Sequence, residues 1–536
     1  MSSSRSTPLE IRFWAATDTG RTRDHNEDNF LVDKKLNLFV VADGMGGHAA
    51  GEVASSVAVR EVRRVVAENR ERVEAFIKED SPEGRRSLVK LLEEAVLAAC
   101  ARVYELSRES ADRQGMGTTL SMMLVAGARG FIGHVGDSRI YLARAGQVHQ
   151  LTEDHSLVNE LIKRGRLKPG DEFESPYKNA VTRAVGVYET VEPDTFDFDV
   201  LPGDNFLLCS DGLSCYIDDP LTLDYLTRDE IKAIPEAFIV LANESGGKDN
   251  ITAVVVRALQ AEAEDQQKRA QDVRQKLDTL RAIQLFKYLT YKGLVKVLNI
   301  TTTRTFEAGE VVFQEDGREE TFFVLLEGQV RLTKGASVLA DLEAGSHFGE
   351  MAMIDKAPRS ATATALRPSR ALVIHRGRFF ELLRNEPLMA VKMTWSFIQV
   401  VNARLRATNR ELQLARETIE AMRRNPGGVL AELPNLDPSV GFVATLPIAV
   451  TDELIPGFLL SEQESGGTDP LLRIGPENAA EHPDLDARMG LAQTEPDRPA
   501  SGRTLPERPA TLAVQATEPN LNALEPGRTR KEDEKP

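Results

Sequence analysis

The sequence contains few cysteines and no long hydrophobic run. Its 536 residues include only three cysteines, Cys100, Cys209 and Cys215, whose spacing fits neither a disulfide framework nor a cysteine metal site. No apolar stretch approaches the roughly 20 residues that cross a bilayer, and the N-terminus lacks the apolar core of a signal peptide. We therefore expect a cytoplasmic protein of the reducing compartment, with no membrane partner.

Positive charge is also in short supply. The chain has 66 Lys and Arg against 82 Asp and Glu, a formal net charge of −16, and nucleic-acid binding requires a positive surface, so we expect no nucleic-acid partner. Residues 425–536 hold 19 acidic and 9 basic residues and 15 of the 26 prolines, but only two aromatics. Such a segment cannot bury enough apolar surface to offset chain entropy, which predicts a disordered acidic Pro-rich tail. Within it, residues 441–460 are apolar enough to dock as a short segment.

The first 424 residues are predicted to form two folded units. In the first unit, the apolar runs at residues 38–42, 120–125 and 206–209 predict buried strands, while residues 50–68 and 86–108 have helical spacing. Residues 258–282 then become charged, with an apolar stripe on one face, and predict a helical connector. The second unit has glycines regularly spaced between short apolar runs, which is typical of a small β-barrel or jelly roll. A long helical pattern follows at residues 376–424.

Acidic residues in the first unit stand where the predicted strands end. Asp43 and Asp211 each follow an apolar run and precede a glycine, and further carboxylates recur in the motifs NED (26–28), GDSR (136–139) and KDN (248–250). A single Asp-Gly is usually a turn, but five such places in one unit favour a site for a hard cation such as Mg²⁺ or Mn²⁺. No His/Cys ligand set accompanies them, so zinc is not expected.

Residues 11–257 resemble the type-2C metal-dependent Ser/Thr protein phosphatases. The motifs DTGRTRDHNEDNF, VVADGMGGHAAGEVAS, GMGTTL, HVGDSRIYL, LTEDHSLVNELI, VTRAVG, LLCSDGL and GGKDNITAVVV occur in the order of the family. The resemblance implies an α+β fold in which a β-sandwich is flanked by helices and a binuclear metal site lies at one end. The reaction that it implies is hydrolysis of phosphoserine and phosphothreonine by a metal-activated water.

The resemblance also implies roles for individual residues. Asp43 would bridge two metals, Asp211 and Asp249 would complete the first, and Glu27 with the Gly44 carbonyl would hold the second. Asp28 would bind metal-bound waters, Asp137 matches a residue linked to a third, weaker metal in bacterial relatives, and Arg23 matches the arginine that grips the substrate phosphate.

The chain departs from animal members of the family at Met45, where those have His; many bacterial members have Met. The general acid is therefore unassigned: His48 and His155 are candidates, although a structural role is favoured for both. Thr118 and Thr119 are expected to support the core. Residues 154–186 match the mobile flap of the family, which gives no substrate identity.

The second unit contains a compact set of residues suited to a phosphate and a ribose. Gly349-Glu350 opens a short predicted helix, and Arg359-Ser360-Ala361 follows. Helix N-terminal amides favour an anion, arginine can clamp it in bidentate fashion, and Glu350 can accept from a ribose hydroxyl. The alternative is an ordinary salt bridge between Glu350 and Arg359 on a β-barrel.

Residues 283–400 resemble the cyclic-nucleotide-binding domains, through FEAGEVVFQEDG, TFFVLLEGQVRL and the phosphate-binding cassette. The resemblance implies a β-roll with flanking helices, in which the site is lined by Gly349, Glu350, Arg359, Ser360 and Ala361. The ligand would be cyclic AMP or cyclic GMP. Ser360 does not decide between them, and cyclic AMP is favoured as the commoner bacterial ligand.

A C-terminal helix is predicted at residues 401–424. Within the longer helical pattern that contains it, apolar residues recur every seven positions, at Ile398, Leu405, Leu412 and Ile419. Such a seam is typical of pairing with a second copy of the chain. The alternative, one amphipathic helix packed on its own barrel, is equally consistent with the sequence.

These observations lead to one main hypothesis and one rival. The main hypothesis is a bacterial phosphatase that uses two or three Mn²⁺ or Mg²⁺ ions, acts on phosphorylated proteins such as Ser/Thr kinases or their substrates, and is regulated by cyclic nucleotide through the connector. The rival is a nucleotide-sensing scaffold whose phosphatase unit is inactive.

Overall fold

The computed structural model describes residues 9–46, 50–168, 176–177, 180–259, 264–354 and 357–424. The predicted tail, with its apolar segment 441–460, lies outside the described residues, as do His48 and part of the predicted flap. All described residues belong to one compact unit.

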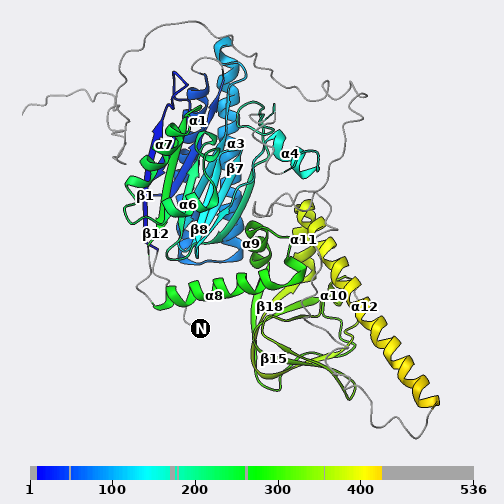
Figure 1. Ribbon diagram of the computed structural model, residues 1–536. Helices are drawn as coiled ribbons and strands as arrows, with labels where there is room; N and C mark the ends of the chain where they lie inside the picture. Colours follow the sequence, from blue (N-terminus) through cyan, green and yellow to red (C-terminus); the bar gives the residue numbers. More distant parts are fainter. Residues whose placement is uncertain are drawn as a thin grey trace, which may run out of the picture. The chain divides into compact units, whose positions relative to one another are not determined.

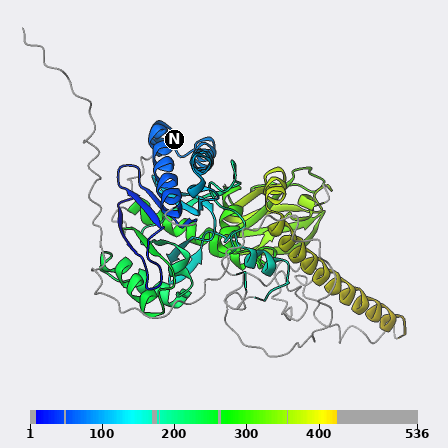
Figure 2. The same ribbon diagram turned by 90° about the horizontal axis from the view of Figure 1, so that it is seen from above.

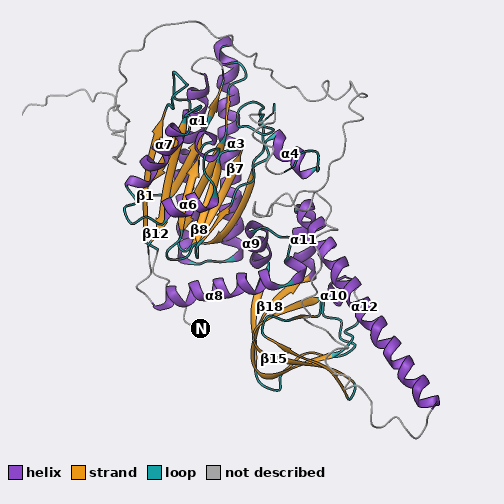
Figure 3. Ribbon diagram, viewed as in Figure 1, coloured by secondary structure: helices purple, strands orange, loops and turns teal. Residues whose placement is uncertain are grey.

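The N-terminal half is a sandwich of two five-stranded sheets (Figures 1 and 3), in which neighbouring strands are antiparallel. The first sheet has the order β1-β12-β11-β8-β9, with bounds Ile11–Asp18, Ile251–Ala258, Asn205–Cys209, Arg139–Arg144 and Gln147–Gln150. The second has the order β10-β7-β6-β3-β2, with bounds Asp194–Asp199, Arg129–Val135, Leu120–Ala126, Leu38–Ala42 and Asn29–Asp33. A short pair, β4 (Gly44–Met45) and β5 (Gly117–Thr118), stands apart.

The strand β3 shows how the sequence builds the two layers. Its residues are all buried, and because strand side chains alternate between faces, Phe39 and Val41 enter the core between the sheets. Leu38, Val40 and Ala42 instead pack against helices on the outer face. The continuous apolar run that predicted a buried strand therefore reflects burial on both faces, and the strands predicted near residues 120–125 and 206–209 are present as β6 and β11.

Helices cover both outer faces of the sandwich. Phe76 of α2 and Leu92 of α3 join the core cluster on the second sheet, together with residues of α1, and Phe238 of α7 joins the cluster on the first sheet. The first turn of α3 follows from its sequence: the Ser81 side chain accepts from Gly84 N–H, and Pro82 occupies the first helical position. The helices of this half are α1 (Ala50–Glu68), α2 (Arg70–Lys78), α3 (Pro82–Glu109), η1 (Ala111–Arg113), α4 (Leu157–Lys163), α5 (Asp211–Ser214), α6 (Asp219–Leu226) and α7 (Ala233–Glu244).

The connector is helical, as predicted, and it is packed rather than free. The helix α8 (Glu264–Ala282) buries Val273, Leu277 and Leu280, the face that the sequence indicated. The segment that follows the connector forms two short helices rather than one continuous helix. A 3₁₀ turn, η3 (Gln284–Phe286), is followed by α9 (Tyr291–Asn299), because the Thr290 hydroxyl caps a new N-terminus by accepting from Gly293 N–H.

The second half is a β-roll with flanking helices (Figure 1). The sheet has the order β13-β18-β15-β16, while β14 pairs with β18 and β17 with β15. Aromatic side chains fill its interior, including Phe313, Phe323 and Phe348, whose rings lie within 6 Å of one another. The elements are β13 (Thr301–Phe306), β14 (Val311–Phe313), β15 (Thr321–Lys334), β16 (Ser337–Glu343), β17 (His347–Phe348), α10 (Met351–Ile354) and β18 (Thr362–His375).

The C-terminal helical pattern consists of two helices rather than one. α11 (Arg376–Asn385) ends before Glu386, and α12 (Pro387–Arg424) begins directly after it. The break is a proline effect, since the residue before proline is disfavoured in the helical conformation and Pro387 is well suited to a first turn. The helix predicted at residues 401–424 is therefore the C-terminal part of α12, which begins at Pro387.

One side of α12 packs on its own domain, while its heptad seam does not. Met389 and Met393 are buried, whereas Ile398, Leu405 and Leu412 are 46%, 56% and 49% exposed. In Figures 1 and 2 the C-terminal part of α12 extends away from the β-roll. Together the two halves form the predicted α+β fold, and among the described residues no helix is long and apolar enough to cross a membrane.

The buried ion pair of Arg144 with Asp204 generates the first prediction. Both side chains are at least 94% buried, and Arg144 Nε donates to Asp204 Oδ1 at 2.8 Å. Asp204→Ala leaves a buried guanidinium uncompensated and should lower the free energy of unfolding by about 3–5 kcal/mol. Urea denaturation measures the loss. The control is Asp341→Ala, which breaks the exposed Arg331 pair and should cost less than about 1 kcal/mol; equal losses would contradict the prediction.

Candidate functional site

The predicted acidic residues gather at one end of the sandwich. Asn29 at the start of β2 pairs with Ala42 at the end of β3, which places Glu27 and Asp28 beside Asp43. In the other sheet, Cys209 at the end of β11 pairs with Ala253 near the start of β12, which brings Asp211 toward Asp249. Antiparallel pairing thus brings to one edge carboxylates that are far apart in the sequence.

Asp28 is the most deeply buried of these carboxylates. Its Oδ2 accepts from the hydroxyls of Ser210 and Thr252, both at 2.7 Å, while its Oδ1 is buried without a hydrogen-bond partner. Burial raises the pKa of Asp28 to about 7, opposed by the two hydroxyls and reinforced by Asp211 and Asp249. Oδ2 of Asp28 is therefore held in place by two hydroxyls, while Oδ1 remains available.

The neighbouring carboxylates repel one another. Burial, then the charges of Asp28, Asp211 and Asp137, raises the pKa of Asp43 well above its ordinary value. Burial and Asp211 likewise raise the pKa of Asp137 to about 8. Burial and Asp249 raise the pKa of Asp211, against a hydrogen bond with Asp43. Burial and mutual repulsion thus oppose ionisation of these carboxylates, and a cation bound among them would relieve that repulsion.

The described residues contain no three His, Cys, Asp or Glu side chains that already converge on one ion position. Their donor chemistry nevertheless fits a hard cation: Glu27 Oε1, Asp28 Oδ1 and Asp211 Oδ1 are all buried without a hydrogen-bond partner. Burial also raises the pKa of Glu27. Oxygen-only ligands with excess negative charge suit Mg²⁺ or Mn²⁺.

Two glycines allow the backbone to pass close to the Glu27 side chain. A Cβ on Gly51 would lie 2.6 Å from Glu27 Oε1, and one on Gly44 would lie 2.2 Å from the Gly51 carbonyl oxygen. The glycines of the predicted motif therefore allow α1 to begin directly against the carboxylate. At the open side of the cluster, Arg23 is half exposed and donates to Asp249 Oδ2 at 2.9 Å.

Some supporting residues were quoted only as parts of motifs, without an assigned role. Asn250 accepts from Glu27 N–H at 2.8 Å and donates to the carbonyls of Thr19 and His25, so it fixes the strand entry that carries Glu27. Asp43 N–H donates to Thr119 Oγ1 at 2.9 Å and Thr118 donates to the Asp43 carbonyl. Both threonines are buried and hold the backbone of Asp43.

His155 is buried and engaged at both ring nitrogens, which agrees with the structural role favoured from sequence. Its Nδ1 accepts from Gly136 N–H at 3.1 Å, and its Nε2 lies 3.3 Å from Asp194 Oδ1. Because Nδ1 is an acceptor, the neutral ring carries its proton on Nε2. The other candidate acid, His48, lies outside the described residues.

The second predicted site is organised around a buried cation. Arg359 is 3% exposed, and its guanidinium donates to the Gly349 carbonyl at 3.2 Å and to the Thr321 carbonyl and hydroxyl, both at 2.8 Å. Its Nε is buried without a partner. Among the described residues, the charges of Glu319 and Glu350 act on Arg359, but its hydrogen bonds go to Gly349 and Thr321 rather than to a carboxylate.

The surroundings of Arg359 explain the residue types of the cassette. Gly349 has a φ of +81°, and a Cβ there would lie 2.7 Å from the Arg359 guanidinium, so only glycine fits without displacement. Phe313 stacks beneath the guanidinium with its ring 4.1 Å away. Ala361 is buried and Ser360 is exposed. Thr321, which the sequence analysis did not single out, holds the arginine from the start of β15.

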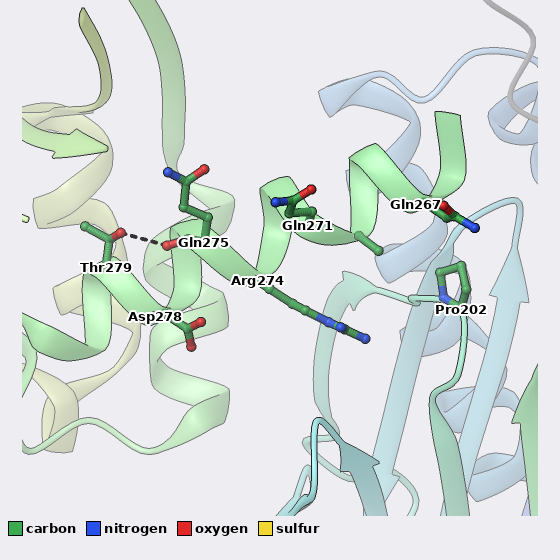
Figure 4. Close-up of a pocket in the computed structure, with 8 residues that line it drawn as sticks. Pro202, Gln267, Gln271, Arg274, Gln275, Asp278 and Thr279 are labelled. Atoms are coloured by element: carbon green, nitrogen blue, oxygen red, sulfur yellow. Dashed lines mark hydrogen bonds between the residues drawn. The ribbon is translucent and has the colours of Figure 1, made fainter. Parts of the chain in front are cut away.

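A pocket of about 600 Å³ lies along α8, where Pro202 of the β10–β11 loop faces Gln267 and Arg274 (Figure 4). Its lining contains neither the acidic cluster nor Arg359. The pocket therefore has no part in the two sites described above.

Two family descriptions match the chain: "Protein phosphatase 2C" at residues 19–275 and "Cyclic nucleotide-binding domain" at residues 303–386. The serine/threonine phosphatase stp of Listeria welshimeri is 39% identical over 249 residues, covering 45% of this chain and 93% of that protein. The serine/threonine protein phosphatase PstP of Mycobacterium tuberculosis is 37% identical over 247 residues, but the match spans only 45% of that protein.

A solved structure of the catalytic domain of PstP, described as a complex with 2 manganese ions, matches at 35% identity with a TM-score of 0.41, covering 47% of this chain and 100% of that one. The match to the Listeria relative covers nearly the whole of that protein and is sufficient to identify the family. The chain therefore belongs to the bacterial serine/threonine phosphatases of the protein phosphatase 2C family, and it carries a cyclic nucleotide-binding domain at residues 303–386.

Proposed function

We propose that the acidic end of the sandwich is a divalent-metal site at which water hydrolyses phosphoserine and phosphothreonine in proteins. The observation that supports the proposal most directly is the set of buried, unpartnered oxygens on Glu27, Asp28 and Asp211. Burying such oxygens is costly unless they have a partner. A cation supplies that partner, and no second set of this kind is described in the sandwich.

The roles proposed for the individual residues are those that the family resemblance implies. Asp43, Asp211, Asp249 and Glu27, with the Gly44 carbonyl, would hold two Mn²⁺ or Mg²⁺ ions, and Asp137 would contribute to a third. When bound, such ions activate water near neutral pH and stabilise charge on phosphoryl oxygens.

The chain's own residues prepare the reaction. Asp28, fixed by Ser210 and Thr252, orients water through its free oxygen. Arg23, half exposed at the edge, is placed to bind the phosphate of a protein substrate by charge-assisted hydrogen bonds. It is already paired with Asp249, so an arriving phosphate would share or replace that partner.

Asp211→Asn tests this proposal. It should lower Mn²⁺-dependent turnover of a phosphothreonine peptide by roughly 10²–10³-fold, the usual loss when a charge-stabilising group leaves an active site. Because burial raises the pKa of Asp211, its ionised form opposes folding, so the thermal midpoint measured in EDTA should stay equal or rise. Asp229→Asn, an exposed position, is the control. Parent-like turnover in Asp211→Asn would remove this residue from the site.

We further propose that the β-roll binds a cyclic nucleotide, cyclic AMP being favoured, and thereby regulates the phosphatase in the cytoplasm. The buried Arg359, whose described hydrogen bonds go to Gly349 and Thr321 and which keeps a free Nε, is suited to a phosphate. Burial lowers the pKa of Arg359, against the charges of Glu319 and Glu350, so a bound anion would favour the charged form of this arginine. Gly349, Glu350, Ser360 and Ala361 would line the remainder of the site.

Arg359→Ala should weaken cyclic-nucleotide binding by roughly 10- to 150-fold, since a hydrogen bond to a charged group contributes about 1.5–3 kcal/mol. Phosphatase activity without nucleotide should be unchanged, while any response of the rate to cyclic AMP or cyclic GMP should disappear. Calorimetric titration with each nucleotide gives the affinity. Arg331→Ala, an exposed arginine on the same β-roll, serves as the control, and unchanged affinity in Arg359→Ala would place the ligand elsewhere.

The exposed seam of α12 supports a homodimer of the chain. Ile398, Leu405, Leu412 and Ile419 are each 46–56% exposed at seven-residue intervals, and exposed apolar seams with this period pair with like helices. The opposite side of the helix, at Met389 and Met393, already packs on its own domain. A second copy would therefore cover the seam without disturbing the fold.

The double variant Leu405→Glu, Leu412→Glu tests the dimer. Light scattering after size exclusion should give twice the chain mass for the parent protein and the single chain mass for the variant, because like charges at facing seam positions repel. Gln413→Glu with Glu417→Gln, at exposed positions off the seam, is the control. A monomeric parent protein would contradict the proposal.

A further inference from the structure

The helix α9 lies between the two proposed sites. It forms hydrogen bonds both with the sandwich and with the α11–α12 junction. At its N-terminus, the Tyr291 ring stacks on His149 with centroids 4.1 Å apart, and its hydroxyl accepts from Arg144. At its C-terminus, Asn299 donates to the Asp197 carbonyl at 2.7 Å and accepts from Arg129 at 2.9 Å. Both ends of α9 are thus fastened to the sandwich.

Between these ends, Lys292 reaches the strand β10. Its ammonium lies 3.3 Å from Asp194 Oδ2 and 5.2 Å from the centre of the Phe196 ring, and its side chain is only 13% exposed. Asp194 also accepts from Arg183 at 3.1 Å. Burial alone would raise the pKa of Asp194, but hydrogen bonding with His155 and the charge of Lys292 hold it well below its ordinary value. Asp194 is therefore a carboxylate shared by α9, Arg183 and His155.

His155 connects Asp194 to the end of the sandwich where the metal site is proposed. Besides its side-chain bond from Gly136 N–H, its own backbone N–H donates to the Gly136 carbonyl at 2.8 Å. Gly136 has a φ of +108°, and a Cβ there would lie 2.6 Å from Thr119, the residue that holds Asp43. The residue after Gly136 is Asp137. The orientation of the His155 ring thus determines how firmly the backbone before Asp137 is held.

On its other side, α9 contacts the helices that follow the nucleotide site. Lys296 Nζ donates to Glu386, the residue between α11 and α12. Arg376, the first residue of α11, donates through Nε to the carbonyl of Met353 in α10 at 2.7 Å. Met353 follows Glu350 of the predicted nucleotide site by three residues. A change at α10 therefore has a bonded route to α9.

We propose that α9 is a strut, that is, a packed helix that links the two proposed sites. Lys292 acts as a positioning residue for Asp137, through Asp194, His155 and Gly136. Lys296 binds Glu386 at the α11–α12 junction. This inference rests on the proposed function, since it names the means by which nucleotide would reach the phosphatase site. It differs from coupling through the connector α8, because α8 contacts β10 at the opposite end, where Arg269 bonds Asp199. Coupling of this kind requires an element that both sites bias.

Lys292→Met tests the positioning role. This substitution keeps the length of the side chain but removes the ammonium group that Asp194 contacts. Because Asp194 contacts His155 and His155 accepts from Gly136 N–H, the Gly136 amide should then exchange with solvent about tenfold faster in EDTA. The Mn²⁺ concentration that gives half of the thermal stabilisation should rise roughly tenfold, the lower range for loss of an outer-sphere partner. Lys292→Arg should restore both values.

Arg269→Met is the matched control, because it removes an ion pair between the same strand and α8 without touching His155. It should lower stability but leave the Gly136 amide unchanged. Equal exchange in Lys292→Met and Arg269→Met, or failure of Lys292→Arg to restore protection, would overturn the inference. Because exchange is measured without metal or substrate, this result is independent of whether the parent protein is an active phosphatase.

Lys296→Met tests the other end of the strut. In the parent protein, 1 mM cyclic AMP or cyclic GMP (about the upper end of ordinary ligand concentrations) should change the exchange rate of the Gly136 amide. In Lys296→Met the nucleotide should bind, as calorimetry would show, yet leave that rate unaltered. A parent protein that binds nucleotide without a change at Gly136, or a variant that still responds, would overturn the regulatory end of the strut.

Discussion

Repulsion among the buried carboxylates at one end of the sandwich is the constraint on which the rest of the structure depends. Asp43, Asp137 and Asp211 follow strands whose side chains fill both cores, so the fold cannot separate them without losing those cores. Their pKa values are raised because burial and mutual charge oppose ionisation. A cation bound at this end of the sandwich would relieve the repulsion. The energy of the apolar cores thus maintains an arrangement that is electrostatically unfavourable without a positive counter-charge.

The β-roll also contains a buried charge without a full partner, but this charge is positive. Arg359 is buried on aromatic rings and bonded to backbone oxygens rather than to a carboxylate. A dipolar oxygen compensates a buried charge only partly, so the site favours an anion as the acidic cluster favours a cation. In both places, the ligand class follows from which charge the fold has buried without a full partner.

Sequence alone could predict the strands and the helical connector, and could nominate candidate residues for both sites, because these depend on local patterns. The run at residues 38–42, the Asp-Gly pairs and the cassette each lie within a short window. The break at Glu386 could also have been found, since Pro387 signals it. What could not be predicted depends on contacts between distant segments: Thr321 beneath Arg359, Asn250 behind Glu27, and Lys292 against Asp194 are separated by 38, 223 and 98 residues. No spacing rule joins such pairs.

The position of α9 also explains why a packed connection suits this chain better than a flexible one. A flexible linker raises the local concentration of one domain near another but transmits no orientation. α9 instead presents two lysines one turn apart, Lys292 to the sandwich and Lys296 to the α11–α12 junction. A rotation or shift of the helix would change both ion pairs together. A packed, bonded element can convert a change at one buried charge into a change of geometry at another.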